Sequence, residues 1–65
     1  MTQLIRLPDV IARTGKSRSR IYAEIETGEF PRPVKIGERA VAWPAADIDG
    51  WIAQRIAARD AGVQP

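Results

Sequence analysis

The sequence has no cysteine and no histidine among its 65 residues. Without cysteine there are no disulfides and no thiolate metal sites, so the redox state of the compartment is unconstrained. Without histidine the chain lacks the side chain that most often transfers protons near neutral pH. Its longest apolar runs span only a few residues, far short of the ~18–20 that cross a bilayer, and no segment resembles a signal peptide. We therefore expect a cytoplasmic protein with no membrane partner.

The short length allows one domain with a small core. In such a domain, apolar burial at ~25 cal/mol per Å² roughly cancels the ordering cost of ~1.5 kcal/mol per residue. We expect this domain to cover residues 1–59, with a flexible tail over 60–65. A large catalytic cleft is not expected. Asp47 and Asp49 lie two apart on a predicted helix and diverge in direction, and there is no Gly-rich phosphate loop. The sequence therefore predicts no enzyme, no cofactor and no metal.

Charge is distributed unevenly along the chain, although the net charge is only +2. Residues 1–36 carry seven Lys or Arg against four Asp or Glu, whereas residues 37–65 carry three against four. This asymmetry predicts one basic face, of the kind that binds double-stranded DNA.

Capping signals predict two short helices at the start of the chain. Pro8 suits a first helical turn, and Gly15 suits the left-handed position after a helix that ends near Thr14. Ser17 is a strong N-cap candidate for a second helix over residues 18–27, which Gly28 would close. Two short helices joined by a Gly-containing turn are typical of a helix-turn-helix.

The middle of the chain predicts an elbow followed by a β-hairpin. Two prolines make residues 30–33 extended, and Phe30 is expected to enter the core from this elbow. The hairpin is expected to turn at residues 37–40, and residues 4–7 to add an edge strand. Pairing Ile36 with Val41, and Val34 with Trp43, would place all four apolar side chains on one face.

A third helix is expected to begin at Pro44. Its apolar stripe would comprise Ile48, Trp51, Ile52 and Ile56. Trp43 and Trp51 are expected to lie in the core and to anchor the hairpin to this helix.

Basic and hydroxyl side chains gather where the second helix begins. Arg18, Ser19 and Arg20 fall in its first turn, where a recognition helix presents side chains to the major groove. Cations there oppose the helix dipole, so stability does not explain them. Glu24 and Glu26 make the far end of this helix acidic, so any contacts with DNA should concentrate at its start.

Each candidate residue can also be explained by a structural role that needs no DNA contact. Ser17 caps the helix, although a helix N-terminus can also hold a phosphate. Tyr22 packs at the edge of the core or offers its hydroxyl to a phosphate. The cationic side chains of the turn, the elbow and the hairpin contact DNA or form a solvated surface. The candidate DNA-binding residues are Lys16, Ser17, Arg18, Ser19, Arg20, Tyr22, Arg32, Lys35 and Arg39.

Several blocks of the chain together resemble the AlpA family of prophage-associated regulators. They are LIRLPDV at 4–10, TGKSRSRIY at 14–22, GEFPRPVKIG at 28–37, AVAW at 40–43 and DIDGWI at 47–52. The resemblance implies an α+β, mainly α fold: a small winged helix-turn-helix of the excisionase-like, MerR-like group, with three helices and a β-hairpin wing. It also implies that residues 17–27 enter the major groove and that residues 34–43 form the wing, on the backbone or in the minor groove.

The resemblance implies a phage- or mobile-element-associated transcriptional regulator acting at the nucleoid of a bacterial or phage-infected cell. Two alternatives stay open: an excisionase-like factor that bends DNA and recruits a phage integrase, and a small protein-docking module. For a DNA-binding protein of this size we expect either a homodimer or several copies on repeated half-sites.

Overall fold

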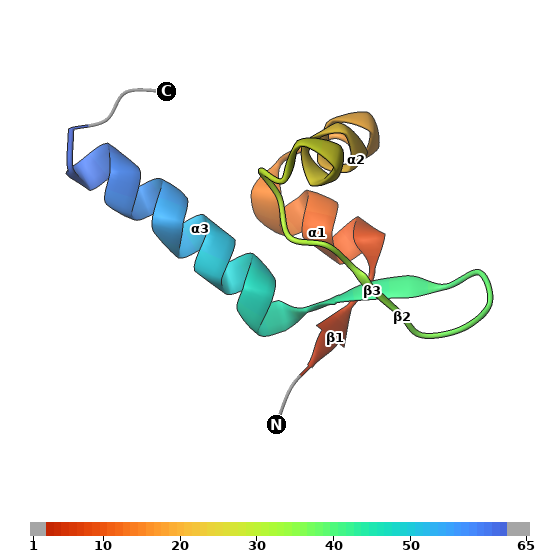
Figure 1. The fold of residues 1–65 in the computed structure, drawn as a ribbon. Helices are drawn as coiled ribbons and strands as arrows, with labels where there is room; N and C mark the ends of the chain where they lie inside the picture. The colour runs from red at the N-terminus through yellow and green to blue at the C-terminus, as the bar shows by residue number, and fades with distance from the viewer. Residues whose placement is uncertain (1–2, 63–65) are drawn as a thin grey trace.

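The computed structural model describes residues 3–62 and contains three helices and a three-stranded antiparallel sheet (Figure 1). In chain order the elements are β1 (Leu4–Ile5), α1 (Leu7–Thr14), α2 (Arg18–Thr27), β2 (Val34–Lys35), β3 (Val41–Pro44) and α3 (Ala45–Asp60). The order in the sheet is β1-β3-β2. The predicted mainly helical winged helix-turn-helix is therefore confirmed.

The ends of the helix pair lie where the capping signals placed them. Gly15 closes α1 at φ 73°, and its N–H donates to the Ile11 carbonyl at 2.8 Å. Ser17 Oγ accepts from the backbone N–H of Arg20 at 3.2 Å and so caps α2. Gly28, at φ 81°, ends α2. These local signals fix the tight turn between the two helices.

The core draws one residue from nearly every element. Trp43 on the central strand is fully buried, and its indole N–H donates to the Pro31 carbonyl at 2.9 Å. Helices α1 and α2 lie on one side of the sheet (Figure 1). The buried cluster consists of Ile5, Val10, Ile21, Phe30, Trp43 and Ile48. The expected core positions of Trp43 and Phe30 are confirmed.

The predicted hairpin register is wrong by one residue. Val34 pairs with Ala42, Lys35 pairs with Val41, and the Ile36 N–H donates to the Ala40 carbonyl at 2.9 Å. The loop therefore has three residues, not four. Because side chains alternate between the two faces of a sheet, this slip moves β2 side chains to the other face.

The slip creates an apolar outer face on the sheet. Val34 and Ile36 are 41% and 45% exposed, whereas Val41 and Trp43 pack on the core side. We call the face away from the core the outer sheet face. By the strand register it comprises Leu4, Val34, Ile36, Ala40, Ala42 and Pro44, of which Ala42 is buried and Ala40 and Pro44 are half-buried.

The apolar stripe of α3 is only half buried. Ile48 is buried, and Trp51 and Ile52 pack against the core, but Ile56 is 46% exposed. The distal half of α3 extends away from the other elements (Figure 1), which elongates the molecule to 42 × 28 × 19 Å. None of the helices within residues 3–62 is long and apolar enough to cross a membrane.

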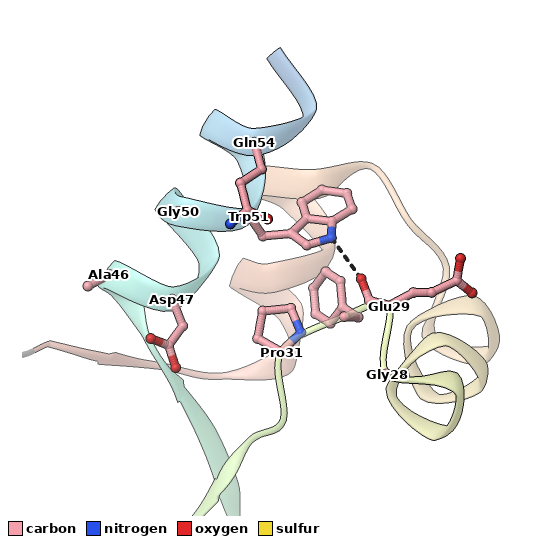
Figure 2. Close-up of a pocket in the computed structure, with 9 residues that line it drawn as sticks. Gly28, Glu29, Pro31, Ala46, Asp47, Gly50, Trp51 and Gln54 are labelled. Carbon is pink, nitrogen blue, oxygen red and sulfur yellow. Dashed lines mark hydrogen bonds between the residues drawn. The ribbon is translucent and has the colours of Figure 1, made fainter. Parts of the chain in front are cut away.

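Trp51 joins α3 to the elbow rather than to the hairpin, which corrects the expected anchor. Its indole N–H donates to the Glu29 carbonyl at 3.1 Å, as Figure 2 shows. Its ring meets Phe30 edge-on, with centroids 5.1 Å apart. α3 continues through Asp60, the first residue of the expected tail, and residues 63–65 of that tail lie outside the described part of the chain.

We predict opposite sensitivities for two residues of the hairpin. Trp43→Ala removes the largest fully buried side chain and should lower the free energy of unfolding by ~3–5 kcal/mol. Val34→Thr, on the outer sheet face, should change it by no more than ~0.5 kcal/mol. Chemical denaturation of both variants measures the difference. If Val34→Thr lowered the free energy of unfolding by several kcal/mol, Val34 would have to face the core, as in the register that the sequence predicted.

Gly50 offers a stabilising substitution. It lies inside α3, and a Cβ built there meets nothing within 4 Å. Gly50→Ala should therefore raise the free energy of unfolding by up to ~1 kcal/mol, through helix propensity and a less flexible unfolded chain. Thermal melts check this against Gly15→Ala, which forces a left-handed residue and should destabilise. A lower melting temperature for Gly50→Ala would contradict the conclusion that there is free space for a Cβ atom at this position.

Candidate nucleic-acid interface

The first turn of α2 presents its side chains to solvent. Arg18, Ser19 and Arg20 are all exposed. The guanidinium carbon of Arg18 lies 5.7 Å from the centroid of the Tyr22 ring, so the two side chains stack one turn apart. This contact limits the directions in which Arg18 can point. Tyr22 itself is 38% exposed and borders the same surface.

A concave surface of about 510 Å³ joins the start of α2 to the hairpin loop. We call it the arginine groove and define it by Arg6, Arg18, Tyr22 and Arg39. Leu7, Pro8 and Val41 complete its lining, which contains no carboxylate. Three guanidinium groups around one hollow concentrate positive potential there, and this attracts polyanions.

Arg6 is the functional candidate that the sequence analysis missed. It precedes α1 in an extended conformation, with φ −92° and ψ 168°, and its side chain is exposed. Its carbonyl accepts the Val10 N–H at 3.1 Å, which ties the residue to the first turn of α1. The pairing of β1 with β3 brings Arg6 near the hairpin. The predicted edge strand was the one signal for this placement.

Glu24 organises two of the predicted cationic residues. Its carboxylate lies 2.9 Å from Lys16 Nζ and 3.5 Å from Arg20 Nε. The Lys16 ammonium also lies 5.2 Å from the centroid of the Trp51 ring, and its side chain is only 21% exposed. Lys16 therefore joins the turn, α2 and α3. The Arg20 side chain, by contrast, is 68% exposed.

The other predicted residues are exposed but lie outside the groove lining. Ser17 accepts the capping hydrogen bond, and Ser19 is exposed on the first turn of α2. Arg32 is exposed on the elbow, and Lys35 is exposed on β2 opposite Val41. The structure thus brings Arg18, Tyr22 and Arg39 together with Arg6, while the remaining candidates surround or lie apart from them.

A second hollow, of about 410 Å³, has the opposite character (Figure 2). Glu29 and Asp47 line it together with Trp51 and Gln54, and its lining contains no cationic residue. This hollow suits no phosphate. Within residues 3–62 no three His, Cys, Asp or Glu side chains form a group that could hold a metal ion.

The tight helix pair, the hairpin wing and the groove between them define a small winged helix-turn-helix protein. Residues 3–56 match the family described as prophage CP4-57 regulatory protein (AlpA), so the chain belongs to the AlpA family.

Two relatives illustrate the range of this similarity. The chain is 43% identical to uncharacterized protein ORF88 of Enterobacteria phage P4, over 92% of this chain and 68% of that protein. It is 36% identical to the DNA-binding transcriptional activator AlpA of Escherichia coli strain K12, over 82% of this chain and 84% of that protein.

We predict that Lys16 acts mainly through Glu24. Lys16→Met should lower the free energy of unfolding by ~0.5–1.5 kcal/mol, because it removes a half-buried ion pair and a cation–π contact. A double-mutant cycle with Glu24→Gln should show coupling between the two side chains. Additive effects in denaturation experiments would mean that the pair contributes nothing.

Proposed function

We propose that this protein is a DNA-binding transcriptional regulator that uses the start of α2 and the hairpin together. The observation that carries the proposal is the arginine groove, which connects these two elements. Membership of a prophage regulator family and the similarity to a transcriptional activator support it.

A winged protein on DNA must accommodate a phosphate strand. When a helix lies in the major groove and the hairpin beside it reaches the minor groove, one backbone strand passes between them. The arginine groove lies between these elements and offers three guanidinium groups to that strand. Each neutralised phosphate releases counterions, which strengthens binding at low salt. We therefore assign Arg6, Arg18 and Arg39 to the backbone, with the Tyr22 hydroxyl beside them.

Base recognition falls to the outer side of α2. Arg20 is 68% exposed, and its Nε is held by Glu24, so its terminal amino groups are available for the O6 and N7 atoms of a guanine. Ser19 offers a hydroxyl on the same turn. The free N–H groups of α2 behind Ser17 suit a phosphate. Arg32 and Lys35 would extend the backbone contact, whereas Lys16 contributes mainly by holding Glu24.

A second candidate is an excisionase-like factor, which would use the same groove, bend its site and recruit a phage integrase. The similarity to a protein of Enterobacteria phage P4 is compatible with an association with a phage. In both cases the protein would act in the cytoplasm, at the nucleoid. In both cases more than one copy would bind, because one small module contacts too little DNA for a tight site.

We predict that the arginines divide into two classes. Arg20→Ala should cost ~1–3 kcal/mol of binding and relax specificity at one base pair. Arg6→Ala and Arg18→Ala should weaken binding to all sequences alike, and each should lower the log–log salt slope by about one. The measurement is fluorescence anisotropy on duplexes selected from a random pool with the unmutated protein, repeated over a range of salt concentrations.

Arg55→Ala is the charge-matched control. Arg55 is exposed on α3 and does not line the arginine groove, so its loss should leave specificity intact. If Arg55→Ala weakens binding as much as Arg18→Ala does, attraction to DNA is diffuse and the groove assignment is wrong. If the folded, unmutated protein selects no duplex and shows no salt-dependent binding, the protein-docking alternative replaces the proposal.

A further inference from the structure

A second basic groove lies between the C-terminal end of α1 and the distal half of α3. It has a volume of about 340 Å³, and the cationic residues that line it are Arg13, Arg55 and Arg59. Among the described residues, none of those that line it carries a carboxylate. We call this hollow the α3 groove. Three guanidinium groups around one hollow attract an anionic ligand.

The acidic residues near the α3 groove neutralise its arginines only weakly. Arg13 lies 3.6 Å from Asp49. Arg59 lies 2.9 Å from Asp60, its neighbour in the sequence. All four side chains are at least 40% exposed, and exposed ion pairs contribute little. Within the described part of the chain no carboxylate pairs with Arg55, so positive charge is available to an incoming partner.

Arg55 lacks the helix-end role of the other two arginines. A cation in the last turn of a helix is favourable, and Arg13 and Arg59 occupy that place in α1 and α3. Arg55 lies one turn before the last, and its side chain is exposed. It also borders a smaller hollow with Glu24 and Glu29, but both carboxylates already have partners within the chain. The fold therefore does not use the charge of Arg55.

The floor of the α3 groove is apolar. Trp51 and Ile52 line it, and both are half-buried because they also pack against the core. Apolar and cationic side chains alternate along one stripe of α3 at positions i, i+3, i+4 and i+7, which are Ile52, Arg55, Ile56 and Arg59. A nucleic-acid backbone presents mainly phosphates to such a stripe, whereas a peptide can combine carboxylates with an apolar side chain.

We propose that the α3 groove docks an acidic segment of another protein, in which carboxylates flank an apolar side chain. Carboxylates form forked pairs of hydrogen bonds with guanidinium groups. Arginine and tryptophan are enriched where protein interfaces gain most of their affinity. The apolar side chain of the segment would lie against Trp51 and Ile56. A second copy that presents the same groove is disfavoured, because arginines would face arginines.

The α3 groove and the arginine groove are separate surfaces. Their linings share no residue. The hairpin and the distal end of α3 lie at opposite ends of the molecule (Figure 1). The protein can therefore hold DNA in one groove and an acidic segment in the other. Docking does not depend on DNA binding and is tested without DNA, so its failure would leave the proposed function intact.

Selection from random-sequence peptides displayed on phage tests the chemistry of the partner. The unmutated protein is immobilised, and the enriched peptides are sequenced. We expect them to combine Asp or Glu with an apolar residue. The same library on Arg55→Glu protein should lose these peptides, because the reversed charge repels carboxylates. Enrichment of basic or purely apolar peptides, or no enrichment at all, would overturn the proposal.

Titration of a synthetic copy of a selected peptide tests the location of the site. Arg55→Ala and Ile56→Ser should each lower its affinity by about tenfold in fluorescence anisotropy, because one removes a charge-assisted hydrogen bond and the other an apolar contact. Both side chains are exposed, so thermal melts should change little. Arg18→Ala, in the arginine groove, is the matched control and should bind the peptide normally. If Arg18→Ala loses the peptide while Arg55→Ala keeps it, the peptide occupies the arginine groove, and the proposal is wrong.

Duplex DNA is the other possible occupant, and salt titrations distinguish it. Arg55→Ala should bind duplex DNA with the same log–log salt slope as the unmutated protein, because the α3 groove holds no phosphate. If its slope falls by about one, and duplex DNA displaces the peptide from the unmutated protein, the groove binds nucleic acid and the proposal is overturned.

Discussion

The burial of Trp43 is the constraint on which the rest of this small structure depends. Its ring lies on the central strand, and its indole N–H is bonded to the Pro31 carbonyl, so one residue ties the sheet to the elbow. The helix pair packs on the same core through Val10 and Ile21. A domain of this size holds little stability in reserve. The relative positions of α2 and the hairpin, and hence the arginine groove, therefore follow from how this ring is enclosed.

Around that core, some cationic side chains form ion pairs with Glu24, whereas others line the arginine groove, which contains no carboxylate. Glu24 holds Lys16 beside Trp51 and steadies Arg20, so this part of the basic segment stabilises the fold. Arg6 and Arg39 have no carboxylate beside them in the lining of the groove. Because the net charge is small, position matters more than number. The basic surface exists because acidic residues are placed elsewhere, for example in the hollow behind the elbow.

The sequence correctly predicted the features that depend on only a few neighbouring residues. The two helices, their glycine ends and the Ser17 cap depend on local backbone chemistry, and all were found. The prediction of the hairpin register was wrong because the register depends on the length of the loop. The alternating pattern of apolar residues is compatible with either register when the loop length is unknown. Arg6 was missed for a related reason: its role depends on which strands pair. The sequence therefore predicted which residue types form the candidate site, but it did not predict which residues from different elements lie together in the groove.

The length of α3 is the last feature that needs a physical account. Ile48 and Trp51 are enough to attach this helix to the core and the elbow. The remaining turns bury little, yet they keep an apolar residue at position 56 and charges of opposite sign around it. A single exposed isoleucine is ordinary on a protein surface, so Ile56 contributes little to folding and indicates no partner by itself. The core therefore accounts for the first half of α3, whereas the second half contributes little to the core.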